Sequence, residues 1–304
     1  MTDRIASFTQ TNNLINSSLR LQSNYAEKQI QVSSGYKSTD YAGIAKSSTR
    51  LLNLESDVAR IDQQTENAQI ALDRTNLMFS SLEAILEQSQ SFAADLSASV
   101  SGFGSEGADL ANIAQSNMNQ IASSLNVQIS DRYLFGGSAT QTRPIDLSGY
   151  GGQVFSLPGT STADTSFYQG NSYLQNVESA DGFVVNYGVL ADNPAFEKMI
   201  RGYDLIRTNP NDQDTLEEAN RIIEEAVDDL AVLKASVSQN AQSLNRQIVE
   251  NKEEINLLDS QIVTIREVDV AEASVRLKQL ETQLEASYTI TAALLNLKLS
   301  DFIR

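Results

Sequence analysis

The 304-residue chain contains no cysteine, no histidine and no tryptophan. The absence of cysteine excludes disulfide bonds and thiol nucleophiles. The absence of histidine excludes Ser-His-Asp triads and, with no cysteine either, most kinds of zinc site. We therefore predict that the protein is not an enzyme and that it has no catalytic residues, no metal site and no cofactor.

Positive charge is also scarce, because 22 lysines and arginines stand against 39 acidic residues and give a formal charge of −17. A nucleic-acid surface needs clustered basic side chains, so no nucleic-acid partner is expected. Residues 1–50 and 266–304 together hold 11 basic and 9 acidic side chains, whereas residues 51–265 hold 11 and 30. Either the middle is simply the charged soluble body, or the ends are buried against many copies of something that would repel net charge.

Long hydrophobic runs are missing too. Residues 1–20 lack the apolar core of about 7–15 residues that a signal peptide requires. The longest uncharged stretch near the C-terminus, residues 286–297, has 12 residues, and a membrane span needs about 20. We expect no membrane partner and, if the protein is exported, a route that uses no cleaved leader.

Helical periodicity dominates the residues that are present. Between residues 51 and 86, nine of eleven positions spaced alternately by three and four are apolar, which predicts a long helix over residues 46–95. The same spacing from Leu216 to Ile265 predicts a second long helix with one shift of phase. Two shorter helices are predicted, over residues 4–33 and 108–130.

A capping box is suggested at the start of the second long helix by Thr215 and Glu218. Ahead of this helix, residues 131–204 are rich in Gly, Ser, Thr and Tyr. We predict a small β-rich insert there, with strands near residues 153–157 and 182–187. The glycine pair at 136–137 is expected to turn the chain where the helices end and the insert begins.

The two ends of the chain carry more apolar surface than one pair of helices can bury. The N-terminal helix has two adjacent heptad rows, and the segment from Val270 onward is apolar on nearly all sides. Isolated helices are marginal in water, so we expect the ends to be disordered or loosely helical in the monomer and to fold on assembly. The predicted assembly interface consists of Phe8, Ile15, Leu19, Ile30, Leu277, Leu280, Leu284, Leu294, Leu295 and Leu297.

The predicted fold class is mainly α, a long antiparallel helical rod or coiled coil formed by both chain termini, with the β-rich insert in the middle. Three domains are expected. Residues 1–45 with 266–304 form the terminal assembly domain, residues 46–130 with 205–265 form the helical rod, and residues 131–204 form the outer insert.

Three patterns that resemble functional sites are better explained structurally. Residues 102–107 match G-x-G-x-x-G, but a dinucleotide site needs a preceding strand, and the flanks here are helical. Residues 211–214 lack the glycine and the distal glutamate of a calcium loop, so they are expected to cap a helix. The paired carboxylates between residues 217 and 229 fall mainly outside the apolar seam and are expected on a solvated helix face.

Both ends of the chain resemble the flagellin superfamily. Residues 32–43, VSSGYKSTDYAG, are similar to the Ser-Ser-Gly segment that joins inner and outer helices there, and residues 284–297, LEASYTITAALLNL, are similar to its C-terminal assembly helix. The resemblance implies paired terminal helices that line an inner tube, with the middle of the chain facing outward.

Within the superfamily, the middle of the chain resembles the hook–filament junction family of hook-associated proteins. The motifs that carry this likeness are RYLFGG at residues 132–137, RPID at 143–146, FYQG at 167–170 and NPAF at 193–196. The implied role is a structural adaptor ring between hook and filament, in the extracellular flagellum. The implied partners are other copies of the chain, the adjacent hook-associated junction protein, flagellin, the flagellar type III export apparatus and a secretion chaperone. A filament flagellin and a secreted coiled-coil binding module remain alternatives.

Overall fold

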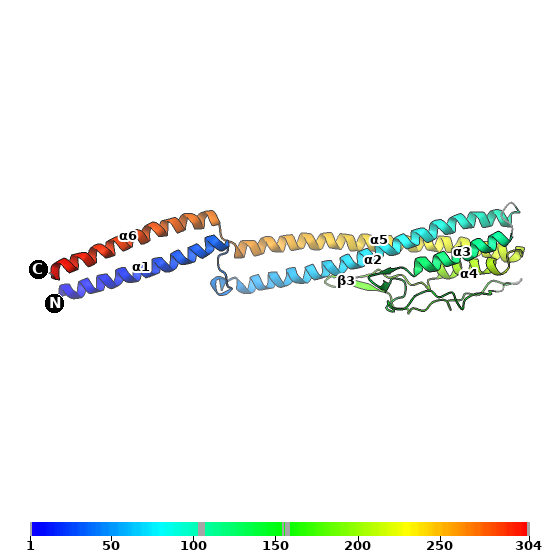
Figure 1. Ribbon diagram of the computed structural model, residues 1–304, viewed down its shortest axis with the longest axis horizontal. Helices are drawn as coiled ribbons and strands as arrows, with labels where there is room; N and C mark the ends of the chain where they lie inside the picture. Colours follow the sequence, from blue (N-terminus) through cyan, green and yellow to red (C-terminus); the bar gives the residue numbers. More distant parts are fainter. Residues whose placement is uncertain (1, 103–106, 154, 156–158, 303–304) are drawn as a thin grey trace. The chain divides into compact units, whose positions relative to one another are not determined.

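The computed structural model describes residues 2–102, 107–153, 155 and 159–302, but not the side chains of residues 2–8, 10, 11, 107, 108 and 294–302. Most of this chain is helical (Figure 1). The described helices are α1 (Thr2–Ser34), α2 (Ser48–Val100), α3 (Gly107–Leu125), α4 (Pro194–Thr208), α5 (Gln213–Arg266) and α6 (Val270–Phe302), with a short 3-10 helix, η1, at Ala42–Ile44. The predicted long helices are confirmed.

The described strands form two antiparallel two-stranded sheets, β1 (Gln128–Ile129) with β2 (Arg132–Tyr133) and β3 (Asn176–Ala180) with β4 (Phe183–Asn186). The strand expected near residues 182–187 is therefore confirmed. The strand expected over residues 153–157 is wrong at Gln153 and Phe155, which are irregular, and its other residues lie outside the described chain. The range 131–204 also contains most of helix α4, so its strand content is lower than expected.

Contacts divide the chain into two units, each formed from segments far apart in the sequence. The terminal unit comprises residues 1–60 and 255–304, and the central unit comprises residues 61–254. The mainly helical fold with small central sheets confirms the predicted fold class. Among the described helices, none is both long and apolar enough to cross a membrane.

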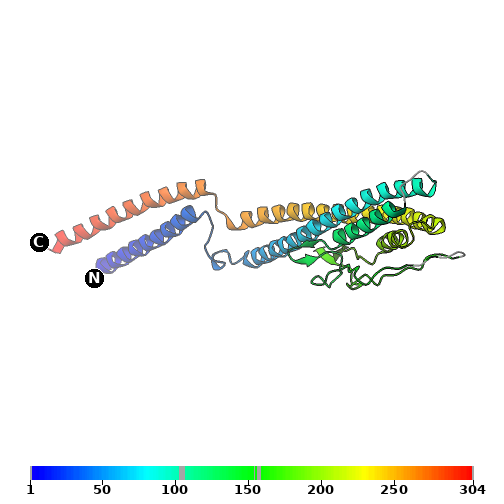
Figure 2. The ribbon, with the colours of Figure 1, turned by 45° about the vertical axis from the view of Figure 1, so that its right-hand side comes forward.

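The core of the central unit lies between α2, α3, α4 and α5. The predicted heptad row of α5 is buried there, including Leu216, Ala219, Ile223, Ala226 and Leu230. On α4 the apolar row Phe196, Met199, Ile200, Tyr203 and Ile206 belongs to this core, and nearly the whole helix from Ala195 to Ile206 is buried. The strands and irregular segments of this unit lie along one side of its helices (Figure 1 and Figure 2).

The segment after α3 anchors these irregular segments to the core. Ser130 and Asp131 adopt φ values of 50° and 61° and turn the chain between β1 and β2, as hairpin turns of the primed type require. Leu134 and Phe135 are buried, and the Phe135 ring meets Phe196 of α4 edge to face with centroids 6.3 Å apart. Gly137 has a φ of 66°, and a side chain there would collide with Asn171. The glycine turn expected from the sequence is therefore present.

Buried charges hold the long irregular segment between β2 and β3 against α4 and α5. Arg201 Nε donates to Glu197 at 2.8 Å, and Glu197 also accepts from the backbone N–H of Asp164. Glu218 accepts from the backbone N–H of Ser161 at 3.0 Å and from Arg221. Burial alone would raise the pKa of Glu218, but these hydrogen bonds outweigh it, so the pKa lies below its ordinary value.

The capping box predicted with Thr215 and Glu218 is wrong. Helix α5 begins at Gln213, and the Asp212 side chain accepts from the backbone N–H of Thr215 at 3.1 Å. Glu218 is therefore free to bind Ser161 and Arg221 instead of reaching back to the helix start. The expectation that residues 211–214 cap a helix is confirmed.

Candidate assembly surface

Helices α1 and α6 pack against each other in the terminal unit and run antiparallel. Gln22 Nε2 of α1 donates to the Tyr288 hydroxyl of α6 at 2.6 Å, while Tyr36, just after α1, pairs with Glu267, just before α6. Both chain ends therefore lie at the same end of the pair (Figure 1).

The seam between α1 and α6 uses only part of their apolar surface. On α6, Leu284 is buried, and Leu277 and Leu280 are half-buried. On α1, the half-buried apolar residues are Leu14, Leu21, Tyr25 and Val32. These four residues form one of the two heptad rows of the N-terminal helix.

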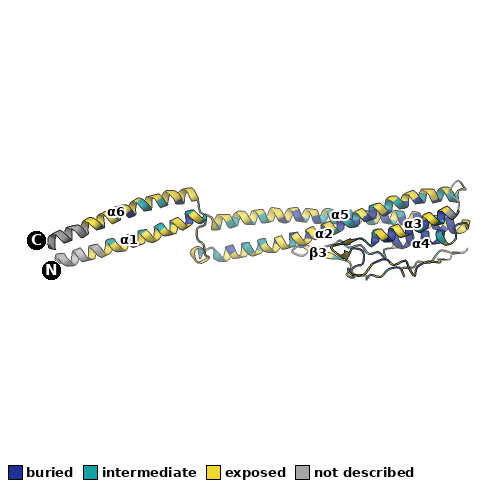
Figure 3. Ribbon diagram, viewed as in Figure 1, coloured by how far each residue is buried: buried dark blue, intermediate teal, exposed yellow. Residues whose placement is uncertain are grey.

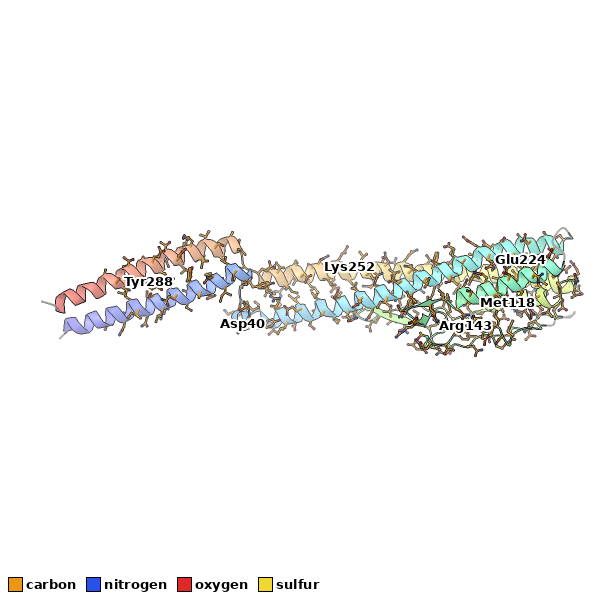
Figure 4. All side chains as sticks on the ribbon, viewed as in Figure 1. Asp40, Met118, Arg143, Glu224, Lys252 and Tyr288 are labelled. Atoms are coloured by element: carbon orange, nitrogen blue, oxygen red, sulfur yellow. The ribbon has the colours of Figure 1, made fainter. Side chains whose placement is uncertain are left out.

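The other heptad row of α1 is exposed to solvent (Figure 3). Leu19 keeps 56% of its accessible surface and Ile30 keeps 50%, and Ile15 is also exposed. On α6, the exposed large apolar residues among the described side chains are Val270 at its start and then Val275, Tyr288 and Ile290; Tyr288 is labelled in Figure 4. We call Ile15, Leu19, Ile30, Val275, Tyr288 and Ile290 the exposed terminal face.

The residues predicted as an assembly interface thus fall into three groups. Ile15, Leu19 and Ile30 belong to the exposed terminal face. Leu277, Leu280 and Leu284 lie in the seam instead, so their first role is to hold α1 against α6. The side chains of Phe8, Leu294, Leu295 and Leu297 lie outside the described residues.

Sequence reasoning did not select Val275, Tyr288 or Ile290 for the interface. Val275 and Ile290 are separated from the seam residues of α6 by spacings that place them on another side of the helix. Tyr288, in contrast, follows Leu284 by four residues and lies at the edge of the seam, where its hydroxyl accepts from Gln22. Periodicity alone could not have identified these residues as exposed, because the sequence does not show which row of α6 packs against α1.

The connector between α1 and α2 is tied to the segment between α5 and α6. Gly35, with a φ of 76°, ends α1 by donating its N–H to the Gln31 carbonyl at 2.9 Å. Its own carbonyl accepts from the Val268 N–H at 3.0 Å, and the Lys37 N–H donates to the Arg266 carbonyl at 2.8 Å. The connector predicted as irregular is therefore irregular but held by regular hydrogen bonds.

Charged side chains add to this junction within the terminal unit. The Lys37 ammonium donates to the carbonyls of Thr264 and Ile265 at 2.5 and 3.0 Å, which satisfies acceptors at the C-terminal end of α5. The Arg266 guanidinium lies 4.6 Å from the centre of the Tyr36 ring and 3.4 Å from Glu55. A positive charge at a helix C-terminus is also favoured by the helix dipole.

The hollow between α1 and α6, about 250 Å³, is lined almost entirely by polar side chains such as Asn24, Glu27 and Gln283. Over the described chain, no group of three or more acidic side chains could hold a metal ion.

One family model matches the C-terminal part of the chain. The model of the bacterial flagellin C-terminal helical region matches residues 220–302, which cover most of α5 and all of α6. The C-terminal part of the chain is therefore similar to the helical region of bacterial flagellins, as its resemblance to that superfamily predicts.

One solved structure shows a similar fold. A structure described as a flagellar hook-associated protein from Vibrio parahaemolyticus is 18% identical to this chain, with a TM-score of 0.57 over 71% of this chain and 96% of the other. Bacillus cereus FlgL is 14% identical, with a TM-score of 0.48 over 73% of this chain and 99% of the other. The fold comparison therefore rests on the first structure. No curated protein sequence matches the chain significantly.

Proposed function

We propose that this chain is an adaptor of the bacterial flagellum that assembles as a ring between the hook and the filament. The exposed terminal face carries this proposal. It is apolar, and it belongs to a unit whose 12 basic and 12 acidic side chains cancel. A neutral apolar face can approach many identical copies without electrostatic repulsion.

Association would supply the burial that the helix pair lacks. Covering a half-exposed leucine or isoleucine contributes about 1 kcal/mol, half of what full burial of such a side chain gives. Six such side chains per copy, repeated around a ring, favour assembly over the monomer. In the free chain, α1 and α6 would be the least stable helices, because their seam holds few fully buried side chains.

The partners in this proposal are other copies of the chain, the adjacent hook-associated junction protein and flagellin. Export would pass through the flagellar type III apparatus, with a secretion chaperone covering the exposed terminal face beforehand. The finished ring would then stand on the extracellular flagellum. The three-domain division expected from the sequence remains part of this proposal, with residues 1–45 and 266–304 as the segments that order on assembly.

A filament flagellin is the second candidate, because the matching family model describes the C-terminal region of flagellins. The two functions differ in where growth stops. An adaptor adds a limited number of copies to the hook and then accepts flagellin, whereas a flagellin continues to add copies of itself.

A seeded assembly assay separates these outcomes. Purified chain is added to short hook fragments that carry the adjacent junction protein, and to filament fragments, and growth is followed by electron microscopy and sedimentation. A short addition on hook fragments supports the adaptor. Tubes that lengthen without limit support the flagellin, and no addition to either seed contradicts both.

The exposed terminal face is tested in the same assay with Leu19→Asp. The charge would have to be buried on assembly, so the amount added should fall about tenfold or more. Val232→Asp is the matched control, because Val232 is 72% exposed on α5 in the central unit. Equal assembly of both variants would show that this face is not the interface.

A further inference from the structure

The central unit carries the whole net charge of the chain. It holds 10 basic and 27 acidic side chains, whereas those of the terminal unit balance. Copies assembled through their terminal units would bring these acidic central units close together. Unless other contacts offset it, the resulting repulsion opposes assembly.

Half of the ten basic side chains of the central unit are paired with carboxylates within the chain. Carboxylates bind Lys198, Arg201, Arg207, Arg221 and Lys234. Arg143, like Lys252, is exposed and makes no hydrogen bond or ion pair with a described residue, but unlike Lys252 it lines a hollow. Its guanidinium group therefore keeps all its donors available.

Arg143 lines an open hollow of about 400 Å³ together with Ser123, Asn126, Gln128 and Tyr133. The wall is well fixed. Gln128 and Tyr133 are opposite each other in the β1–β2 hairpin, and Asn126 exchanges two hydrogen bonds with the Ile145 backbone at 2.9 and 3.0 Å. No acidic side chain lines the hollow, and residues 110–130 contain no charged residue at all. Asp146 interacts electrostatically with Arg143 but does not line the hollow. On a strongly acidic unit, this is a polar hollow with an exposed cation.

The same unit carries a complementary surface on α5. Asp214, Glu217, Glu224 and Asp228 are all exposed and lie on one row spaced by three, seven and four residues, with Arg221 filling the gap in the row. Arg221 does not neutralise this row, because Glu218 and Glu225 already hold its guanidinium group. We call Asp214, Glu217, Glu224 and Asp228 the acidic row.

Within one molecule, the Arg143 hollow and the acidic row belong to different segments of the central unit. Figure 4 shows Arg143 among the irregular segments of the central unit and Glu224 along its helices. A second copy can join them, because contacts between two different surfaces of identical subunits generate rings or tubes.

We propose that the acidic row of one copy docks onto the Arg143 hollow of the adjacent copy. This inference rests on the proposed self-assembly and adds the contact that orients neighbouring central units. A carboxylate of the row enters the hollow and accepts from the Arg143 guanidinium group. Tyr133 and Gln128 offer further hydrogen bonds at the wall. One attractive contact per neighbour then offsets part of the repulsion between the acidic units.

Charge reversal tests the contact in the seeded assembly assay. Arg143→Glu and Glu224→Arg should each weaken addition about tenfold, because an attractive pair becomes a repulsive one. The double variant restores an attractive pair and should recover most of the wild-type assembly. Lys252→Glu is the matched control, since Lys252 is an exposed cation of the same unit with no ion pair to a described residue.

A cross-linking experiment locates the contact directly. The chain has no cysteine, so Ser123→Cys with Asp228→Cys introduces the two thiols without a background. Mild oxidation of assemblies should give a ladder of disulfide-linked copies, since the two sites would lie within bonding reach. Each single-cysteine variant and the pair Ser123→Cys with Lys252→Cys should give no ladder.

The outcomes separate this inference from the proposed function. If the wild type assembles, while Arg143→Glu behaves like Lys252→Glu and no ladder forms, the docking contact is wrong and the adaptor stands. If the double charge variant stays as weak as the single variants, the assigned pairing is wrong. If the wild type adds to no seed, both proposals are overturned together.

Discussion

The terminal and central units belong to one chain but differ in how much of their apolar surface they bury. Of the 44 buried hydrophobic side chains among the described residues, the terminal unit holds four: Leu51, Leu54, Ala273 and Leu284. It nevertheless holds 11 of the 19 exposed large hydrophobic side chains, although it is the smaller unit. The central unit is a completed fold, whereas the terminal unit keeps its apolar residues available for other molecules.

Charge follows the same division. Basic and acidic side chains balance in the terminal unit, and the central unit has an excess of 17 acids. The unit that is proposed to pack against copies is thus the one without net charge, and the unit with a finished core has the charge that keeps a protein soluble. If this comparison is right, the two units should respond separately to mutation.

The largest effect is expected from Phe135→Ala in the central unit. Phe135 is fully buried and packs edge to face on Phe196, so the variant should lose about 3–5 kcal/mol of unfolding free energy. Chemical denaturation measures this loss, and hydrogen exchange of α2 to α5 shows where it occurs. Unchanged exchange of α1 and α6 is expected, and parallel loss of protection there would show that the units do not unfold separately.

A smaller effect of about 2–4 kcal/mol is expected from Leu284→Asp in the terminal unit. Leu284 is 8% exposed in the α1·α6 seam, and a carboxylate there would separate the helices. Exchange protection of α1 and α6 should disappear and seeded assembly should stop, while the melting of the central unit stays unchanged. Ile290→Asp, on the exposed terminal face, is the control that should stop assembly but keep the helix pair.

The sequence predicts the long helices well because their partners lie on one side. The row from Leu216 to Leu230 is apolar at the heptad positions and polar elsewhere, so periodicity alone locates it. Helix α4 was missed although its signals are local. Its apolar residues Phe196, Met199, Ile200, Tyr203 and Ile206 follow helical spacing, and Asn193 followed by Pro194 is a recognisable helix start.

The irregular part of the central unit depends on contacts that no local pattern encodes. Gln153 was expected in a strand, but its backbone N–H donates to the Asp204 carboxylate of α4 at 2.8 Å. The candidate interface was limited in the same way. Two apolar rows on α1 are visible in the sequence, but which row faces α6 depends on how the two helices pack.

The smallest loss of unfolding free energy, about 1–2 kcal/mol, is expected from Glu218→Gln. The pH dependence of this loss distinguishes the central unit from the terminal unit. The described buried acids, Glu197, Asp204 and Glu218, all belong to the central unit. Because folding lowers the pKa of Glu218, its charged form contributes stability above the ordinary value of 4.5. That contribution is lost as the pH falls through the folded value.

The difference in unfolding free energy between wild type and Glu218→Gln should therefore be largest near pH 7 and shrink below pH 4.5. Denaturation of the central unit at a series of pH values measures it. Glu217→Gln, at an exposed neighbouring position of α5, should show little difference at any pH. A difference for Glu218→Gln that stays constant down to pH 3 would mean that the charge of Glu218 does not hold Ser161 and Arg221 in place.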